Sequence, residues 1–361
     1  MKRLIPTLVL VIVCIAAFWY ASSKNFFQEQ PETGTKLVTI SKEDVSGYTI
    51  KTPDGEIELQ KGDGGWQMIK PSALPLNNYS PDSWVDSFTG LMKESTVEAE
   101  PSDLAQFGLD QPTQEFTVKL KDGSSQTLAV GAAVPIQGYR YARYSGSPEV
   151  FQISDSAVTS LAKQPFDFME TSPLQMKYDQ VQSLSVAWKG AKWTLSRNEA
   201  DKDKKAYEAA WKLGDKEVKG ADAGNFLDNA LFMSTNRLVE PAAQIQGLDQ
   251  PELVIELKEL ENGQEKSAVY AGKIKGSDVW IARQGGEWAY AIPVDRVQEL
   301  FDKAKDWEQK QQEAQQAQEQ QEQAQQAQEQ QGLDQEQREQ DQPADDQAES
   351  ASPDSAEDSA N

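Results

Sequence analysis

The chain of 361 residues has no histidine and a single cysteine, Cys14. These absences exclude a disulfide within one chain, zinc or haem ligation by histidine and cysteine clusters, and hydrolytic triads with a histidine base. A basic surplus is also missing, because 58 acidic residues face 35 lysines and arginines, for a formal net charge of −23. Such a chain has no surplus of basic side chains to neutralise a phosphate backbone, so we expect no nucleic-acid partner.

Short catalytic motifs are missing as well. The sequence contains no Asp-x-Asp-x-Asp-Gly calcium loop, no Gly-x-Ser-x-Gly nucleophile elbow and no Gly-x-x-x-x-Gly-Lys phosphate loop. The glycine-rich run at 62–65 is better explained as a turn before Trp66. We therefore expect no enzyme, no cofactor and no metal site, and a carboxylate-dependent hydrolase is the least favoured alternative.

One long apolar run is present, at the N-terminus. Residues 4–20 carry no charge and follow two basic residues. As a helix this run and its small-residue flank nearly span a hydrocarbon core of about 30 Å, and the basic residues favour a cytoplasmic N-terminus. We expect a single-pass anchor in the cell membrane (residues 1–23), a spacer (24–37) and an extracytoplasmic body. A cleaved signal peptide and a lipoprotein acylated at Cys14 are the alternatives.

The body contains an internal repeat. The sequence Gly-Leu-Asp-Gln-Pro at 108–112 recurs at 247–251, 139 residues later. In both places an alternating apolar stretch follows, and then an Asp-Gly or Asn-Gly turn, as in a β-hairpin. We therefore predict two tandem copies of one module, residues 38–175 and 176–307.

Glycine gives the repeated pentapeptide access to positive φ, and aspartate is typical of turns in which its side chain bonds a nearby amide. The candidate structural turn residues are Gly108, Asp110, Pro112, Gly247, Asp249 and Pro251.

Each predicted module has short alternating strands and one amphipathic helix. These helices are expected from Ser80 to about Lys93 and over residues 221–233, and Trp66 and Trp211 are expected in the cores. Few connections are long enough for parallel crossovers. The predicted fold class is α+β: two tandem, mainly antiparallel β modules, each with a packed helix, after an N-terminal transmembrane helix.

The C-terminal tail, residues 308–361, differs sharply in composition and holds 15 acids and two bases. Glutamine, glutamate and alanine favour helix, so we expect a helix over 294–331, with its second half in solvent or frayed. Residues 334–361 are expected to be disordered. A solubilising role is the simpler interpretation of the tail, and a charge-based contact with a partner is the alternative.

Several of these elements together resemble the DUF4340 family. The resemblance is carried by Trp66, the Gly-Leu-Asp-x-Pro element, Val130-Gly131, the Tyr-Ala-Arg at 141–143 and Val150-Phe151, and it covers about residues 40–305. It implies a membrane-anchored bacterial protein of unassigned function. The gene context of such proteins implies an accessory subunit of a gliding-type ABC transporter, with the permease as partner. The family supplies no catalytic residues.

Candidate contact residues lie on the strands predicted after each repeat. Arg143 and Arg283 occupy equivalent places, where a buried or edge ion pair is the simpler interpretation and contact with an anion or ligand the alternative. Exposed aromatic side chains would suit a glycan of the cell wall. The candidates are Tyr139, Tyr141, Tyr144, Trp280 and Trp288. The expected function is therefore a non-enzymatic accessory protein of an ABC transporter, with binding of an envelope polymer as the alternative.

Overall fold

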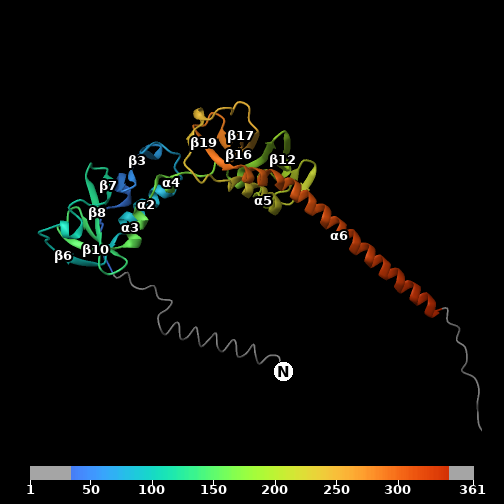
Figure 1. The fold of residues 1–361 in the computed structure, drawn as a ribbon. Coiled ribbons are helices and arrows are strands. Elements are labelled where there is room, and N and C mark those ends of the chain that lie inside the picture. The colour runs from blue at the N-terminus through green and yellow to red at the C-terminus, as the bar shows by residue number, and fades with distance from the viewer. Residues whose placement is uncertain (1–33, 341–361) are drawn as a thin grey trace, which may run out of the picture.

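The computed structural model describes residues 34–340, and their side chains as far as residue 327. It has two lobes, one built on a sheet of eight strands and one on a sheet of nine, and a long C-terminal helix (Figure 1). The predicted mixed α+β class with antiparallel sheets is confirmed. The anchor predicted at residues 1–23 lies outside the described residues. Within 34–340 no helix is both long and apolar enough to cross a membrane.

The N-terminal lobe, residues 34–168, contains the eight-stranded sheet and a separate two-stranded ladder of β1 (Thr35–Lys36) and β5 (Met92–Lys93). Its sheet runs, in spatial order, β4 (Gly65–Lys70), β3 (Gly55–Gly62), β2 (Val45–Thr52), β7 (Gln114–Leu120), β8 (Ser125–Ala133), β9 (Tyr139–Tyr144), β10 (Val150–Ser154) and β6 (Ser95–Glu98). Its α-helices are α2 (Ser80–Thr89), α3 (Asp155–Leu161) and α4 (Pro165–Phe168).

The C-terminal lobe, residues 169–307, contains the nine-stranded sheet. In spatial order this sheet runs β14 (Lys216–Val218), β13 (Trp211–Leu213), β12 (Ala191–Arg197), β11 (Val181–Trp188), β16 (Leu253–Glu261), β17 (Gln264–Lys275), β18 (Asp278–Arg283), β19 (Trp288–Pro293) and β15 (Glu240–Pro241). Its helices are α5 (Gly220–Leu231) and the first part of α6 (Val294–Gln340).

The two sheets have the same order of pairing apart from the additional β14. In each, the first long strand (β2 or β11) lies between its hairpin partner and a strand from much later in the chain (β7 or β16). Both of these long-range pairings contain a register shift near their start, between Val45 and Gly47 and between Val181 and Ser183. In each lobe the segment between the two halves of the sheet contains the longer packed helix, α2 or α5.

The hairpins follow from their turn sequences. Asn262 and Gly263 have φ of 53° and 77°, the two positive values that a type I′ turn requires, and they join β16 to β17. Gly123, at φ 86°, stands in the turn between β7 and β8. Both hairpins were predicted from these dipeptides, and both are confirmed.

Alternation along the strands divides each lobe into a large core and a small satellite cluster. On β18, Val279 and Ile281 point into the large core, whereas Trp280 and Ala282 point to the opposite face. The same alternation separates Phe151 from Val150 on β10. Both faces of the sheets are therefore partly covered, the first by helices and the second by loops.

Helix α2 ends earlier than predicted. Its last residue is Thr89, and Gly90 follows as the C-cap. Met92 and Lys93, expected in the helix, instead form β5 and pair with β1. Trp66, expected in the core, is half-buried, because one edge of its ring reaches the surface polar groups described below.

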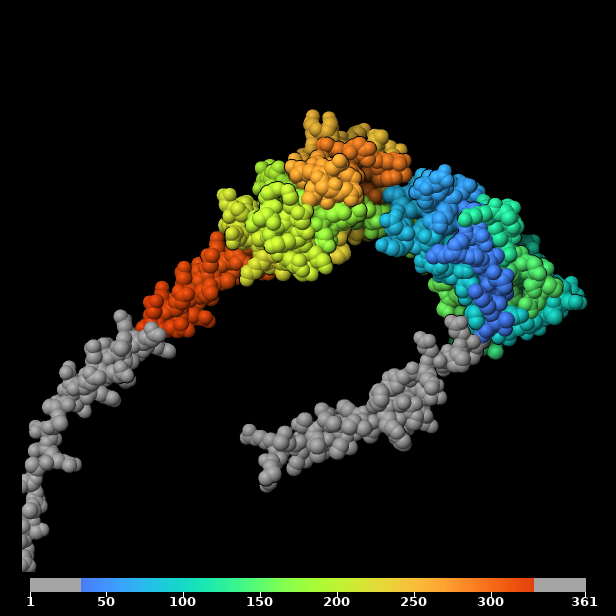
Figure 2. Space-filling model, turned by 180° about the vertical axis from the view of Figure 1, so that it is seen from behind, coloured from blue at the N-terminus to red at the C-terminus, as the bar shows by residue number. Residues whose placement is uncertain are grey.

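Helix α6 packs on the C-terminal lobe only through its first turns. Val297, Leu300 and Ala304 are buried, and Trp307 donates from Nε1 to Asp222 at 3.3 Å. Residues 309–327 are exposed, and Figure 2 shows α6 running away from the lobe. The helix was predicted to end near residue 331, but it continues to residue 340. Residues 341–361 lie outside the described part.

Two glycines of α5 give a matched test of packing. A Cβ on Gly220 would lie 2.1 Å from the Tyr207 carbonyl oxygen, whereas a Cβ on Gly224 meets nothing within 4 Å. We expect Gly220→Ala to lower the free energy of unfolding by about 1–3 kcal/mol through overpacking. Gly224→Ala should raise it by up to about 1 kcal/mol through helix propensity. Chemical denaturation measures both, and a fully stable Gly220→Ala protein would contradict the packing.

Truncation after Gln311 should change the free energy of unfolding by less than about 0.5 kcal/mol, because the removed part of α6 is exposed where its side chains are described. Truncation after Asp295 is the control. It removes the buried Val297 and Leu300 and should cost several kcal/mol. Limited proteolysis of the whole chain should leave a stable fragment ending at about residues 305–315. Protection through residue 340 would show that α6 packs on the body beyond its first turns.

Candidate functional site

The Gly-Leu-Asp-Gln-Pro loops lie on the sheet faces opposite to the helices. Leu109 is buried in the satellite cluster with Val150, and Leu248 packs on the cluster that contains Ile245 and Trp280. Each loop therefore covers apolar strand positions that its own lobe would otherwise expose. This is a packing role within the lobe.

The glycines of these loops are held in conformations that favour glycine. Gly108 is left-handed, with φ 67°, and a Cβ there would lie 3.0 Å from the Ala132 amide nitrogen. Gly247 has φ 84° and faces a flexible lysine side chain. Gly131, on the strand beneath the first loop, leaves space for the Phe107 carbonyl oxygen, which would lie 2.2 Å from an added Cβ. The first loop is thus the more tightly seated of the two.

Asp110 and Asp249 are exposed, and within the described residues neither carboxylate accepts a hydrogen bond. The turn role predicted for their side chains is carried instead by main-chain hydrogen bonds of 3.0 Å in both loops. Pro112 and Pro251 are half-buried and stand shortly before β7 and β16.

The two candidate arginines differ in their surroundings. Arg143 on β9 is half-buried and Arg283 on β18 is exposed. Among residues 34–327 neither has a carboxylate within ion-pair distance, so the ion pair expected for them is absent from this part of the chain. The arginine ion pair of β9 forms at Arg140, whose Nε lies 2.9 Å from Asp155.

The aromatic surface expected on the strands is not exposed. Trp280 and Tyr144 are buried, with 5% and 8% of their surface accessible, and Tyr139, Tyr141 and Trp288 are half-buried. The satellite clusters under the repeat loops explain the burial of Trp280 and Tyr141. Tyr144 instead belongs to the large N-terminal core, and Trp288 packs against the large C-terminal core. The expectation of exposed aromatic side chains here is wrong. Exposed aromatic side chains lie elsewhere, at Tyr79 (82%), Phe232 (65%) and Tyr207 (62%).

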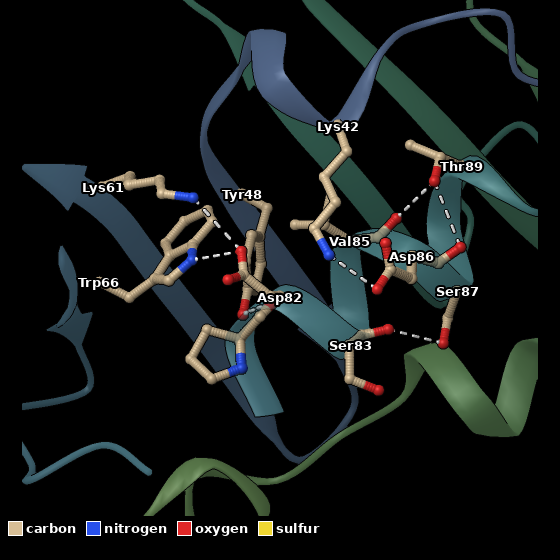
Figure 3. Close-up of polar contacts among 11 residues, drawn as sticks. Lys42, Tyr48, Lys61, Trp66, Asp82, Ser83, Val85, Asp86, Ser87 and Thr89 are labelled. Carbon is tan, nitrogen blue, oxygen red and sulfur yellow. Dashed lines mark hydrogen bonds and ion pairs between the residues drawn. The ribbon is translucent and has the colours of Figure 1, made fainter. Parts of the chain in front are cut away.

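A polar and aromatic cluster joins the start of α2 to the sheet (Figure 3). Asp82 accepts hydrogen bonds from Trp66 Nε1 at 2.9 Å and from Lys61 Nζ at 3.3 Å. Tyr48 stacks on Trp84, with ring centroids 4.1 Å apart, and its ring lies 5.1 Å from that of Trp66. These groups bind one another, and the cluster fixes α2 on the sheet.

The carboxyl groups are tuned toward the ionised form. Burial raises the pKa of Asp82, but hydrogen bonds from Trp66 and Lys61 outweigh it, so the pKa is lowered. Lys119 and Lys70 lower the pKa of Glu58. Among the described residues, every carboxyl group with a shifted pKa has it lowered. A carboxylic general acid requires the opposite shift.

Arg197 is a buried cation with a structural role. Its guanidinium donates to the carbonyl oxygens of Lys204, at 2.7 Å, and Asp179, at 3.1 Å, and stacks on Trp211 with 4.8 Å to the ring centroid. The main-chain carbonyl oxygen of Lys202 also accepts a hydrogen bond from this guanidinium. The guanidinium therefore ties the loop after β12 to the segment before β11. Its two terminal nitrogens donate to main-chain oxygens, whereas the buried Nε has no hydrogen-bond partner within the described residues.

The segment that connects the lobes, around residues 168–171, forms main-chain hydrogen bonds with both lobes. The amide of Asn77 donates to the Phe168 carbonyl at 2.9 Å, and the amide of Glu170 donates to Pro75 at 2.8 Å. On the other side, the amide of Thr235 donates to the Thr171 carbonyl. Phe168 lies in the N-terminal core, whereas the next residue, Met169, lies in the C-terminal core. The side chains thus alternate between two cores, as in a strand.

An open groove of about 460 Å³ lies at this junction. The N-terminal lobe contributes Asn78 and Tyr79, and the connection contributes Gln175 and Lys177. The β16–β17 hairpin supplies acidic and basic groups, including Glu261. Ligand sites prefer such places between structural units, and the groove is the candidate functional site.

The sequence did not reveal this groove. Its walls come from segments about 80–100 residues apart, around positions 78, 176 and 260, and none carries a motif. One sequence feature could have indicated it. Tyr79 stands directly before the Ser-Pro start of α2 and outside the apolar face of that helix. The residues singled out from the sequence lie in the loops and sheet faces, and the groove contains none of them.

Asp82→Asn should reduce stability at neutral pH, because it removes the ion pair with Lys61 but keeps an acceptor for Trp66. The loss should stay below about 1 kcal/mol for this partly exposed pair. Because the folded-state pKa of Asp82 is lowered, its carboxylate stabilises the fold at pH values above the ordinary aspartate pKa of about 3.9. This stabilisation is lost as the pH falls through the folded-state pKa. Unfolding between pH 6 and pH 2.5 measures the difference, with Asp63→Asn, at an exposed turn, as control. A constant difference across this range would contradict the assignment.

No curated protein and no solved structure matches the chain. A sequence profile described as "Domain of unknown function (DUF4340)" matches residues 66–241. The match runs from β4 to β15, so it includes the first Gly-Leu-Asp-Gln-Pro loop and the junction but not the second loop at 247–251. It is narrower than the expected range of 40–305. Residues 66–241 of this chain thus match the DUF4340 family, the family that the sequence resembles.

Proposed function

We propose that this chain is a membrane-anchored, extracytoplasmic and non-enzymatic accessory protein that binds the outer face of an ABC permease. The observation that carries the proposal is the ordered junction, which holds two β lobes in one arrangement by main-chain pairing on both sides. Such a body can present a fixed surface to a protein partner without a reactive centre.

The anchor is proposed from the uncharged run at residues 4–20 and the basic residues before it. The described chain begins close to β1, which pairs with β5 in the N-terminal lobe. Ten residues, 24–33, separate the anchor from this point and span at most about 35 Å. In this arrangement the N-terminal lobe is the one next to the membrane.

We also propose that the lobes are tandem copies of one module. The repeated pentapeptide, the shared order of strand pairing and the shared register shift in β2 and β11 support this. Duplication explains why helices α2 and α5 occupy the same place in the order of elements. It also supplies two similar surfaces from one fold.

A carboxylate-dependent hydrolase is less favoured on chemical grounds. Its acid must hold a proton near neutral pH, and so requires a raised pKa. The described carboxyl groups with shifted pKa values have them lowered, for example Glu149, through hydrogen bonds from Lys93. Groups of this kind serve as ion-pair partners.

A photo-crosslinking amino acid tests the partner. Val97 on β6, next to the entry of the chain into the lobe, is 38% exposed, and Phe232 in the C-terminal lobe is 65% exposed. The full-length protein with the crosslinker at position 97 should capture a permease subunit in intact membranes. Position 232 is the matched control and should give less product. Mass spectrometry identifies the product, and absence of a permease subunit at both positions would overturn the proposal.

A further inference from the structure

The groove at the junction has charged walls but no net charge. Lys177 lies 3.2 Å from Glu261, and Lys266 forms a second ion pair with the same carboxylate. The main-chain amide of Lys177 also donates to Glu259 at 2.8 Å. Two lysines and two glutamates thus offset one another. A strongly charged ligand would have to break these pairs, so the groove suits a neutral one.

Uncharged polar groups line the rest of the groove. Three residues with carboxamide side chains, Asn78, Gln175 and Gln180, line it. Each carboxamide has two N–H donors and an acceptor oxygen, so it can bond a hydroxyl group in either direction. A ligand rich in hydroxyl groups would satisfy these side chains better than an apolar one.

Tyr79 gives the groove a flat apolar surface. Its residue is 82% exposed, the highest value among the exposed large hydrophobic side chains of the described residues. Its backbone is fixed, because its amide donates to Asn77 Oδ1 at 3.0 Å and its carbonyl accepts from the Ser83 amide at 2.9 Å. The start of α2 therefore fixes the backbone position from which the exposed Tyr79 side chain extends at the groove.

We propose that this groove binds a neutral glycan chain. A pyranose ring has a face of C–H groups, which packs on the negative face of an aromatic ring, and a rim of hydroxyl groups, which bond carboxamides. Tyr79 supplies the first kind of contact, and Gln175 and Gln180 the second. The volume of about 460 Å³ lies in the range of roughly 300–1,000 Å³ typical of small-ligand sites.

The test uses the full-length protein and three tetrasaccharides in saturation-transfer NMR and calorimetric titration. Two are neutral, a β-1,4-linked N-acetylglucosamine and an α-1,4-linked glucose oligomer, and the third is an acidic galacturonate oligomer of the same length. Tyr79→Ala removes the aromatic surface. Tyr207→Ala, at a second exposed tyrosine of the described residues (62%), is the matched control.

We expect at least one neutral oligomer to bind, with Tyr79→Ala weakening it about tenfold and Tyr207→Ala leaving it unchanged. Unchanged thermal unfolding of Tyr79→Ala, whose side chain is exposed, excludes loss of fold as the cause. The proposal is overturned if neither neutral oligomer binds, if the acidic one binds more tightly, or if Tyr79→Ala binds as well as the parent protein. Glycan binding does not depend on the permease proposal, because the crosslink at position 97 lies on a different surface.

Discussion

The arrangement of the lobes depends on two consecutive residues whose side chains are buried in different cores. Phe168 is inserted in one core and Met169 in the other, and their backbone pairs with the segment around Leu76. Rotation of one lobe against the other would withdraw one of these side chains from its core and break the main-chain bonds beside it. The cost is that of exposing a large buried side chain, about 2–3 kcal/mol for each. The groove and its two walls depend on this junction, which needs no disulfide.

Local chemistry explains why much of the fold could be predicted. The Asn-Gly dipeptide strongly favours a type I′ hairpin, and period-two alternation indicates which strand residues enter a core. The end of α2 was misjudged because Leu91 continues the apolar pattern, although Gly90 already ends the helix and Leu91 is buried from outside it. Patterns of hydrophobicity record burial, and they do not distinguish burial in a helix from burial just beyond one.

The site residues depend on contacts that sequence spacing does not contain. Tyr141 and Trp280 were expected to be exposed, and they do lie on the sheet faces away from the main cores. What covers them is the repeat loop of their own lobe, and the approach of the first loop depends on Gly108 and on the space above Gly131. Likewise, Tyr79 and Gln175 meet only because the junction folds the chain back on itself. A single sequence gives no measure of such long-range proximity.

The exposed part of α6 contains a short repeat, because the sequence at 314–321 recurs ten residues later at 324–331. The helix gives this repeat a geometric consequence. A helix rises about 1.5 Å and turns about 100° per residue. Loss of one repeat, such as residues 314–323, would bring the far end about 15 Å nearer to the body and rotate it by about 80°. A change of 18 residues would shift it by about 27 Å without rotation. Variation in the number of repeats therefore alters the direction as well as the reach of whatever follows residue 340.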